Sequence, residues 1–291
     1  MSRRFILLLF VSLLKDNVYA QQGTPPEPSR IYLNFCASCH GANGDGFGKA
    51  ARFLFPKPRA FLSNPLQYAT AENRIASSDN IKSTILNGVP NSAMSGWNTL
   101  TNAQIDTLVD DVVQFRRYGA QKRYLDLLLT NGEIDGLSDL ESLTELQRRE
   151  LSSYTKKETE PSSEWKSPIV AGFIPSAERG KELYLAQNCH KCHGEDYRGS
   201  YGIDLSGEYG FPAFASDLIE EPFKYGGQKT DIMRTIRLGV AGTKMPASTT
   251  LTSEQLLDLT EFVTRINSPG PSALTNAERY QRAIGNLPKR P

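Results

Sequence analysis

The segment Cys189-His190-Lys191-Cys192-His193 contains two cysteines that are separated by two residues and followed at once by a histidine. The same Cys-x-x-Cys-His pattern occurs once more, as Cys36-Ala37-Ser38-Cys39-His40. The chain has 4 cysteines, so the two motifs use all of them. Of the 3 histidines, only His190 does not end a motif. A repeat that uses every cysteine indicates one kind of cofactor chemistry at two sites.

A Cys-x-x-Cys-His run is typical of covalent haem c attachment. The two thiols add to the vinyl groups of the haem, and the histidine binds the iron from one face. The sequence therefore predicts two covalently attached haem c groups. The predicted thioether ligands are Cys36, Cys39, Cys189 and Cys192, and the proximal iron ligands are His40 and His193.

Two other uses of the cysteines have to be weighed. Each pair could form a disulfide, because cysteines of exported proteins usually oxidise. All four could instead bind one zinc ion. Neither alternative explains why a histidine follows each pair. His190 falls inside an attachment turn, and we expect it to lie at the surface.

Met94 and Met245 are the predicted distal iron ligands. The chain has only 4 methionines, one of which is the initiator. Met94 follows His40 by 54 residues, and Met245 follows His193 by 52. Each lies in a loop that a glycine opens between two predicted helices. Methionine is more often a core residue than a ligand, and we assign Met233, which falls inside a predicted helix, to packing.

The spacing indicates an internal duplication. Cys36 and Cys189 are 153 residues apart, whereas Met94 and Met245 are 151 apart, so one net change of two residues aligns the halves. Helical periodicity and capping residues predict helices at 29–35, 80–86 and from 101 onward, and again at 177–188, 231–238 and from 252 onward. A carbonyl near Pro56 or Pro58, and one within 202–205, are predicted to hold the proximal histidines.

Length and composition allow about two domains among 291 residues. The balance of 33 basic against 32 acidic side chains gives no support for nucleic-acid binding.

The N-terminus predicts a secretory signal peptide, because it has the basic residues Arg3 and Arg4, the apolar run 5–14 and a small residue at Ala20. Localisation is thus predicted to be periplasmic or otherwise exported, with no transmembrane segment in the mature chain. The predicted divisions are 1–20 signal peptide, 21–118 first domain, 119–175 helical and polar connector, 176–268 second domain and 269–291 tail.

With these motifs in place, the chain resembles the class I c-type cytochromes in a tandem di-haem form. The resemblance implies a mainly α fold, with two cytochrome c-like helical domains that each wrap around a haem. Family members often carry a small residue where the first and last helices cross. Gly180 fits this pattern, whereas the first half offers only Ser29 nearby. Ile203 is a departure, because relatives commonly have proline there.

The predicted function is electron transfer through two His/Met-ligated haems, without catalysis. The protein could act as a soluble carrier or as the cytochrome subunit of a larger oxidoreductase complex. Its partners would be redox proteins such as a periplasmic dehydrogenase, a respiratory complex or a terminal oxidase. The alternative is an enzyme similar to the di-haem cytochrome c peroxidases, with one open haem site. That chemistry uses a further histidine in the family, and this chain has none outside its motifs.

Overall fold

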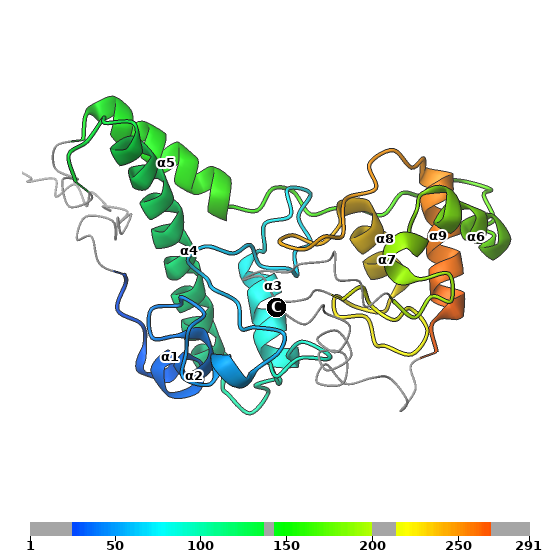
Figure 1. Ribbon diagram of the computed structural model, residues 1–291, viewed down its shortest axis with the longest axis horizontal. Helices are drawn as coiled ribbons and strands as arrows, with labels where there is room; N and C mark the ends of the chain where they lie inside the picture. The colour runs from blue at the N-terminus through cyan, green and yellow to red at the C-terminus, as the bar shows by residue number, and fades with distance from the viewer. Residues whose placement is uncertain (1–24, 137–142, 200–213, 269–291) are drawn as a thin grey trace, which may run out of the picture.

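The computed structural model describes residues 25–136, 143–199 and 214–268, and these ranges are mainly helical (Figure 1). Within them no strand forms, and a single isolated bridge pairs Ala71 with Glu164. This confirms the predicted mainly α class. The N-terminal elements are α1 (Arg30–Phe35), α2 (Ala37–His40), η2 (Ala51–Phe53), α3 (Ser78–Asn87) and α4 (Asn102–Thr130). They are followed by α5 (Glu145–Thr159), α6 (Ala177–Ala186), α7 (His190–His193), α8 (Lys229–Leu238) and α9 (Ser253–Ile266).

The helix starts follow from capping residues in the sequence. Thr101 accepts a hydrogen bond from the backbone N–H of Gln104, whose side chain accepts one from the Thr101 N–H in return. Thr252 and Gln255 form the same reciprocal pair at the start of α9. Each pair satisfies two backbone donors that a helix start would otherwise leave without partners. The predicted starts of both closing helices are therefore confirmed.

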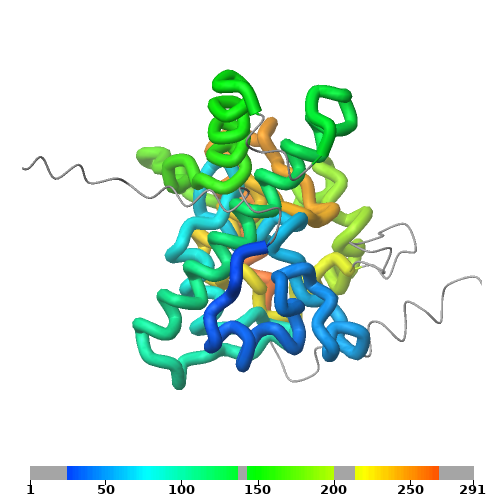
Figure 2. The backbone as a smooth tube through the Cα atoms, turned by 90° about the vertical axis from the view of Figure 1, so that its left-hand side faces the viewer, coloured from blue at the N-terminus to red at the C-terminus, as the bar shows by residue number. Residues whose placement is uncertain are grey.

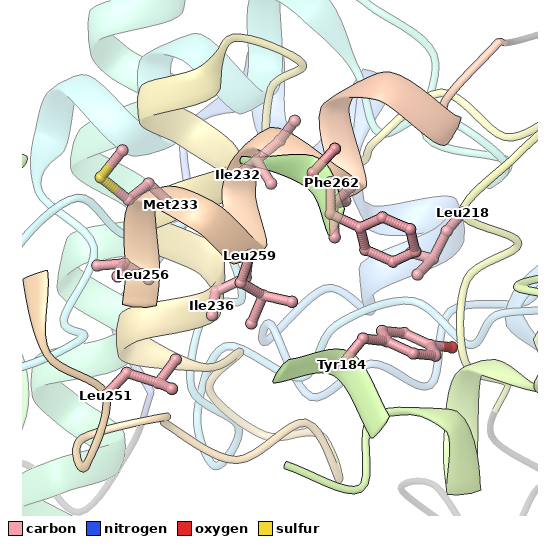
Figure 3. Packing of buried hydrophobic residues seen from close by; sticks show 11 residues of the cluster. Tyr184, Leu218, Ile232, Met233, Ile236, Leu251, Leu256, Leu259 and Phe262 are labelled. Carbon is pink, nitrogen blue, oxygen red and sulfur yellow. The ribbon is translucent and has the colours of Figure 1, made fainter. Parts of the chain in front are cut away.

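The C-terminal domain, formed by α6 to α9, has its own apolar core (Figure 3). α6 crosses α9 at Gly180, where a Cβ atom would lie 2.6 Å from the Cβ of Phe262. Only glycine lets the two backbones approach this closely, which confirms the role predicted for Gly180. Met233 is 5% exposed within this core, as predicted for a packing residue. The cluster comprises Ala177, Tyr184, Leu218, Ile232, Met233, Ile236, Leu251, Leu256, Leu259, Phe262 and Val263.

The N-terminal domain, formed by α1 to α3 and the first part of α4, has a matching core. The backbone N–H and hydroxyl of Ser29 both donate to the buried carboxylate of Asp111 on α4. In the C-terminal domain, Asp258 of α9 likewise accepts from the N–H of Ser176, and it pairs with Arg179 at 2.7 Å. A buried acidic residue of each closing helix thus holds the start of each first helix.

The two closing helices differ by one turn, which corrects the alignment predicted from sequence. Their caps are 151 residues apart, but the residues at the crossing are 147 apart: Asp111 corresponds to Asp258, and Phe115 to Phe262. Four residues are about one helical turn, so α4 has one more turn than α9 between cap and crossing. Apolar periodicity cannot detect this, because a shift of one turn returns the pattern to the same face.

α4 does not end with the N-terminal domain. It continues through Gly119 to Thr130 and packs against α5 as a helical hairpin. At Gly119 a Cβ would lie 2.6 Å from the carbonyl carbon of Leu62, so the helix passes close to the domain surface. The hairpin has a small core of its own, made of Tyr124, Leu125, Leu128, Ile134, Leu143 and Leu151. The predicted connector is therefore helical in part, although its predicted start lies inside α4.

The segment after α5 leads on to α6 and contacts both domains (Figures 1 and 2). The backbone N–H of Trp165 donates to the Thr70 carbonyl of the N-terminal domain at 2.8 Å. The Trp165 side chain packs against the core of the C-terminal domain. The connector therefore contacts both domains. No helix among the described residues has the length and apolar character needed to cross a membrane.

Candidate haem sites

Each Cys-x-x-Cys-His motif forms a single helical turn at the end of a first helix. The N–H of His40 donates to the Cys36 carbonyl at 2.9 Å, and the N–H of His193 donates to the Cys189 carbonyl at 2.9 Å. This turn places both sulfurs of a motif on one side and the histidine beside them. The structure leaves all four thiols free. Neither pair therefore forms a disulfide. The described residues also contain no group of three or more ligands that could hold a metal ion, so the four cysteines form no shared zinc site.

A backbone carbonyl holds each motif histidine by its Nδ1 atom. The His40 Nδ1 lies 2.9 Å from the Arg59 carbonyl oxygen, and the His193 Nδ1 lies 3.0 Å from that of Ser216. An Nδ1–H donated to a carbonyl leaves Nε2 with its lone pair available for a metal. In the first half the prediction was therefore close, because the observed acceptor Arg59 is the residue after Pro58. In the second half it was wrong, and the range 202–205 lies outside the described residues.

Burial keeps both histidines in the form that a metal binds. It lowers the pKa of His40 and of His193, although the hydrogen bond to the backbone carbonyl raises each pKa in part. A histidine with a lowered pKa is neutral at pH 7, and the neutral imidazole is the metal ligand. Burial, with the charges of Asp111 and Cys39, raises the pKa of the Cys36 thiol to about 12.

Aromatic side chains gather in the core of each domain, and one of them stacks on His40. In the N-terminal domain, the ring of Phe61 stacks on His40 with centroids 4.7 Å apart, and Tyr32 packs against Phe115 at 5.2 Å. In the C-terminal domain, Tyr184 contacts Tyr197 at 5.2 Å and Phe262 at 5.7 Å. Flat apolar walls of this kind suit a flat apolar ring system.

A tyrosine of each first helix also fixes the turn that follows the motif. The Tyr32 hydroxyl donates to the Gly41 carbonyl at 2.8 Å, and the Tyr184 hydroxyl donates to the Gly194 carbonyl at 2.7 Å. Gly41 has φ +79° and Gly194 has φ +81°, a conformation that glycine adopts without strain. The glycine after each motif is thus needed for the sharp turn that leaves the attachment helix.

The two methionine loops have the same backbone geometry. Gly88 ends α3 with φ 71°, and Gly239 ends α8 with φ 67°. The N–H of Met94 donates to the Ser92 hydroxyl at 3.1 Å, and the N–H of Met245 donates to the Thr243 hydroxyl at 3.1 Å. Both methionine side chains are partly buried. The glycine-opened loops that the sequence predicts are therefore present at equivalent places in both domains.

In the N-terminal domain, the motif and the residues just after the methionine pack against one core. In the N-terminal domain Cys36 and Trp97, three residues after Met94, both pack against the same cluster. Phe35, next to Cys36, meets Trp97 edge-on at 5.3 Å. In the C-terminal domain, Cys189 packs against the cluster that contains Leu251.

The residues present fit a haem bound through two thioethers and an imidazole. The free cysteine pairs, the oriented neutral histidines and the aromatic walls are the donor set and surroundings that such a group needs. His190 belongs to neither set. Its Nδ1 is buried without a hydrogen-bond partner, so the simple surface position expected for it is only partly right.

Several site residues carried no recognisable signal in the sequence. The carbonyls of Arg59 and Ser216 could not be identified, because every residue has a backbone carbonyl. Tyr32 and Tyr184 had a weak signal, since each precedes a motif by four or five residues.

Comparisons with known proteins agree with this description. Residues 177–267 match the family described as Cytochrome c, and residues 23–110 match that described as Cytochrome C oxidase, cbb3-type, subunit III. The cbb3-type cytochrome c oxidase subunit CcoP of Azospirillum brasilense is 40% identical over 72 residues, which are 25% of this chain and 22% of that protein. The subunit FixP of Azorhizobium caulinodans is 33% identical over 81 residues, which are 28% of this chain and 24% of that protein. The matched part thus spans about a quarter of each relative.

A solved structure shares the fold over most of the chain. It belongs to the reducing HAO-like protein complex of Kuenenia stuttgartiensis, with a TM-score of 0.61 and 24% identity, covering 84% of this chain and 100% of that one. The fold and the two equivalent sites define a mainly helical protein of tandem c-type cytochrome architecture. The chain contains two cytochrome c family domains, one on each side of the α4–α5 hairpin.

Proposed function

We propose that this protein is a di-haem c-type cytochrome that transfers electrons between redox partners without chemical conversion of a substrate. The observation that carries the proposal is the repetition of a complete site: motif, carbonyl-held histidine and methionine loop recur in both domains. When bound, each haem supplies one-electron chemistry at its iron. Cys36 and Cys39 would hold one haem, and Cys189 and Cys192 the other.

The chain's own residues would set the properties of each site. His40 and His193 would each hold a haem iron through a ring nitrogen, and their carbonyl partners fix the orientation of the imidazoles. Met94 and Met245 would bind the irons as thioethers, which would raise the reduction potential and leave no vacant position for a substrate.

The partners proposed are redox proteins. The curated relatives are subunits of cbb3-type oxidases by name, which supports a place in electron delivery to a terminal oxidase or a comparable complex. An exported location fits c-type cytochrome domains and the signal peptide predicted from residues 1–20.

Optical spectroscopy of the holoprotein tests the ligand assignment. Both haems should be six-coordinate and low-spin, with the weak far-red ferric band that thioether ligation produces. Met94→Ala and Met245→Ala should each remove half of that band, while Met233→Leu, a change within the core, should leave it intact. A high-spin haem in the resting native protein, or turnover of hydrogen peroxide, would contradict the proposal and favour the peroxidase-like alternative.

A further inference from the structure

The two loops that hold the proximal histidines touch each other across the domain boundary. Phe55 lies four residues before Arg59, whose carbonyl holds His40, and Phe214 lies two residues before Ser216, whose carbonyl holds His193. The rings of Phe55 and Phe214 meet edge-on, with centroids 5.4 Å apart and an interplanar angle of 66°. Edge-to-face contact at this distance is a favoured arrangement of two aromatic rings.

A second group of contacts fixes the domains around this pair. The Tyr225 hydroxyl donates to the Gln67 side-chain oxygen at 2.7 Å, and the rings of Tyr68 and Tyr225 stack with centroids 6.5 Å apart. The guanidinium of Arg234 on α8 lies over the Tyr68 ring and donates to the Tyr225 carbonyl at 2.9 Å. These contacts hold the two domains in one relative position, so a shift in one histidine loop is not offset by movement of one domain relative to the other.

With a haem bound, the proximal histidine would be the first protein group to respond to a change of oxidation state. Its imidazole would lose electron density on oxidation, so the Nδ1–H would become a stronger donor and the hydrogen bond to the carbonyl would shorten. In the N-terminal domain this bond ends on Arg59, and the backbone from Arg59 leads back over four residues to Phe55. The Phe55 ring is in contact with Phe214, from which two residues lead to the carbonyl of Ser216.

We propose that the Phe55–Phe214 contact couples the two haem sites, so that the oxidation state of one changes the electron affinity of the other. The proposal rests on the proposed function, since it needs a haem at both histidines. Phe55 and Phe214 are then positioning residues that act through the carbonyls of Arg59 and Ser216. Coupling of this kind is reciprocal: each site must change the affinity of the other by the same factor.

The contact limits the size of the effect. An edge-to-face aromatic pair changes an equilibrium constant by roughly two- to tenfold beyond what its buried area contributes. The coupling carried by this pair is therefore at most about tenfold. That is enough to shift one reduction step measurably relative to the other.

The experiment uses the full-length holoprotein and two readouts. The first is the set of hyperfine-shifted proton resonances of the axial ligands in the ferric protein, which report each site separately. The second is a redox titration resolved for both haems. Phe55→Leu should shift the resonances of the C-terminal site, Phe214→Leu those of the N-terminal site, and either change should reduce the coupling factor towards one.

Three further variants make the test specific. Phe53→Leu alters a phenylalanine of the same loop that is 75% exposed, and it should leave the C-terminal resonances unchanged. Phe55→Tyr keeps an aromatic ring and should preserve the coupling. The double variant Phe55→Leu with Phe214→Leu should lose no more coupling than either single variant, because both remove the same contact.

The possible outcomes are distinct. If both sites are low-spin and Phe55→Leu changes only the resonances of its own domain, the proposed coupling is wrong. The same conclusion follows if the coupling factor is unchanged in both leucine variants. If a site of the native protein is high-spin, the proposed function itself fails, and the titration is not needed to show it.

Discussion

Replacement of Gly180 by alanine tests the tight crossing of α6 and α9. A Cβ at this position would lie 2.6 Å from the Cβ of Phe262 and even closer to the Asp258 carbonyl oxygen. An ordinary contact needs about 3.4 Å at least, so the helices would have to separate by roughly 0.8 Å to relieve the Phe262 contact alone, and by more to clear the Asp258 oxygen. That movement would also stretch the bonds from Ser176 and Arg179 to the Asp258 carboxylate.

Two opposing terms set the size of the effect. Overpacking of a well-packed contact costs about 1–3 kcal/mol. Alanine is a better helix former than glycine by about 1 kcal/mol, which offsets part of that cost. The upper half of the overpacking range applies, because the atoms in the way are a backbone oxygen and a Cβ, which cannot rotate aside. We therefore expect Gly180→Ala to lower the free energy of unfolding by about 1–2 kcal/mol after the offset, and Gly180→Val to lower it further. For a domain of this size, 1 kcal/mol corresponds to a Tm decrease of about 4–8 °C.

Thermal unfolding of the holoprotein, followed by far-ultraviolet circular dichroism, measures this effect. Gly227→Ala is the matched control, because a Cβ at Gly227 would meet nothing within 4 Å. The control should leave the Tm of the C-terminal domain unchanged. If Gly180→Ala proved as stable as the native protein or more so, the helices would not be held at the distance described, and the reasoning from close approach would be refuted.

Three other predictions concern the C-terminal domain. Tyr184→Phe removes the hydroxyl that donates to the Gly194 carbonyl. In denaturant titrations it should lower the free energy of unfolding by about 1–3 kcal/mol, because the carbonyl is left without this donor. A larger loss would point to disrupted packing. Thr252→Ala removes the cap of α9 and should cost about 1 kcal/mol, with Thr249→Ala, an exposed position, as control. Hydrogen bonds from Lys229 and Arg265 lower the pKa of Glu261. The contribution of Glu261 to the free energy of unfolding is therefore present above the ordinary glutamate pKa and is lost as the pH falls through the lowered pKa. Glu261→Gln should thus be less stable than the native protein at pH 7 but equal to it in strong acid, and a constant difference across this pH range would contradict the prediction.

Much of the helical framework was predictable from the sequence because its signals are local. Thr101 and Thr252 mark helix starts through capping pairs with residues three positions on, and Gly88 and Gly239 mark helix ends through a backbone conformation that favours glycine. The Cys-x-x-Cys-His turns are local as well. The placement of Met94 and Met245 at the iron stays a prediction, which the spectra described above will test.

What could not be predicted depends on contacts distant in sequence. The carbonyls of Arg59 and Ser216 reach their histidines over 19 and 23 residues, and no side chain identifies them. The extra turn of α4 was hidden because a shift of four residues preserves the apolar face. The predicted division after residue 118 falls inside α4, and Gly119, the next residue, lies where the helix passes close to the backbone of Leu62.

The continuity of α4 determines which part of the chain folds as one unit. Its first half closes the core around the first site, and its second half is buried against α5. A chain that stops at residue 118 would cut this helix and would lack Tyr124, Leu125 and Leu128, which α4 contributes to the hairpin core. The N-terminal domain and the hairpin therefore share one continuous helix. A piece of the chain that keeps both the first site and the partner of the second half of α4 has to extend at least to Thr159, the last residue of α5.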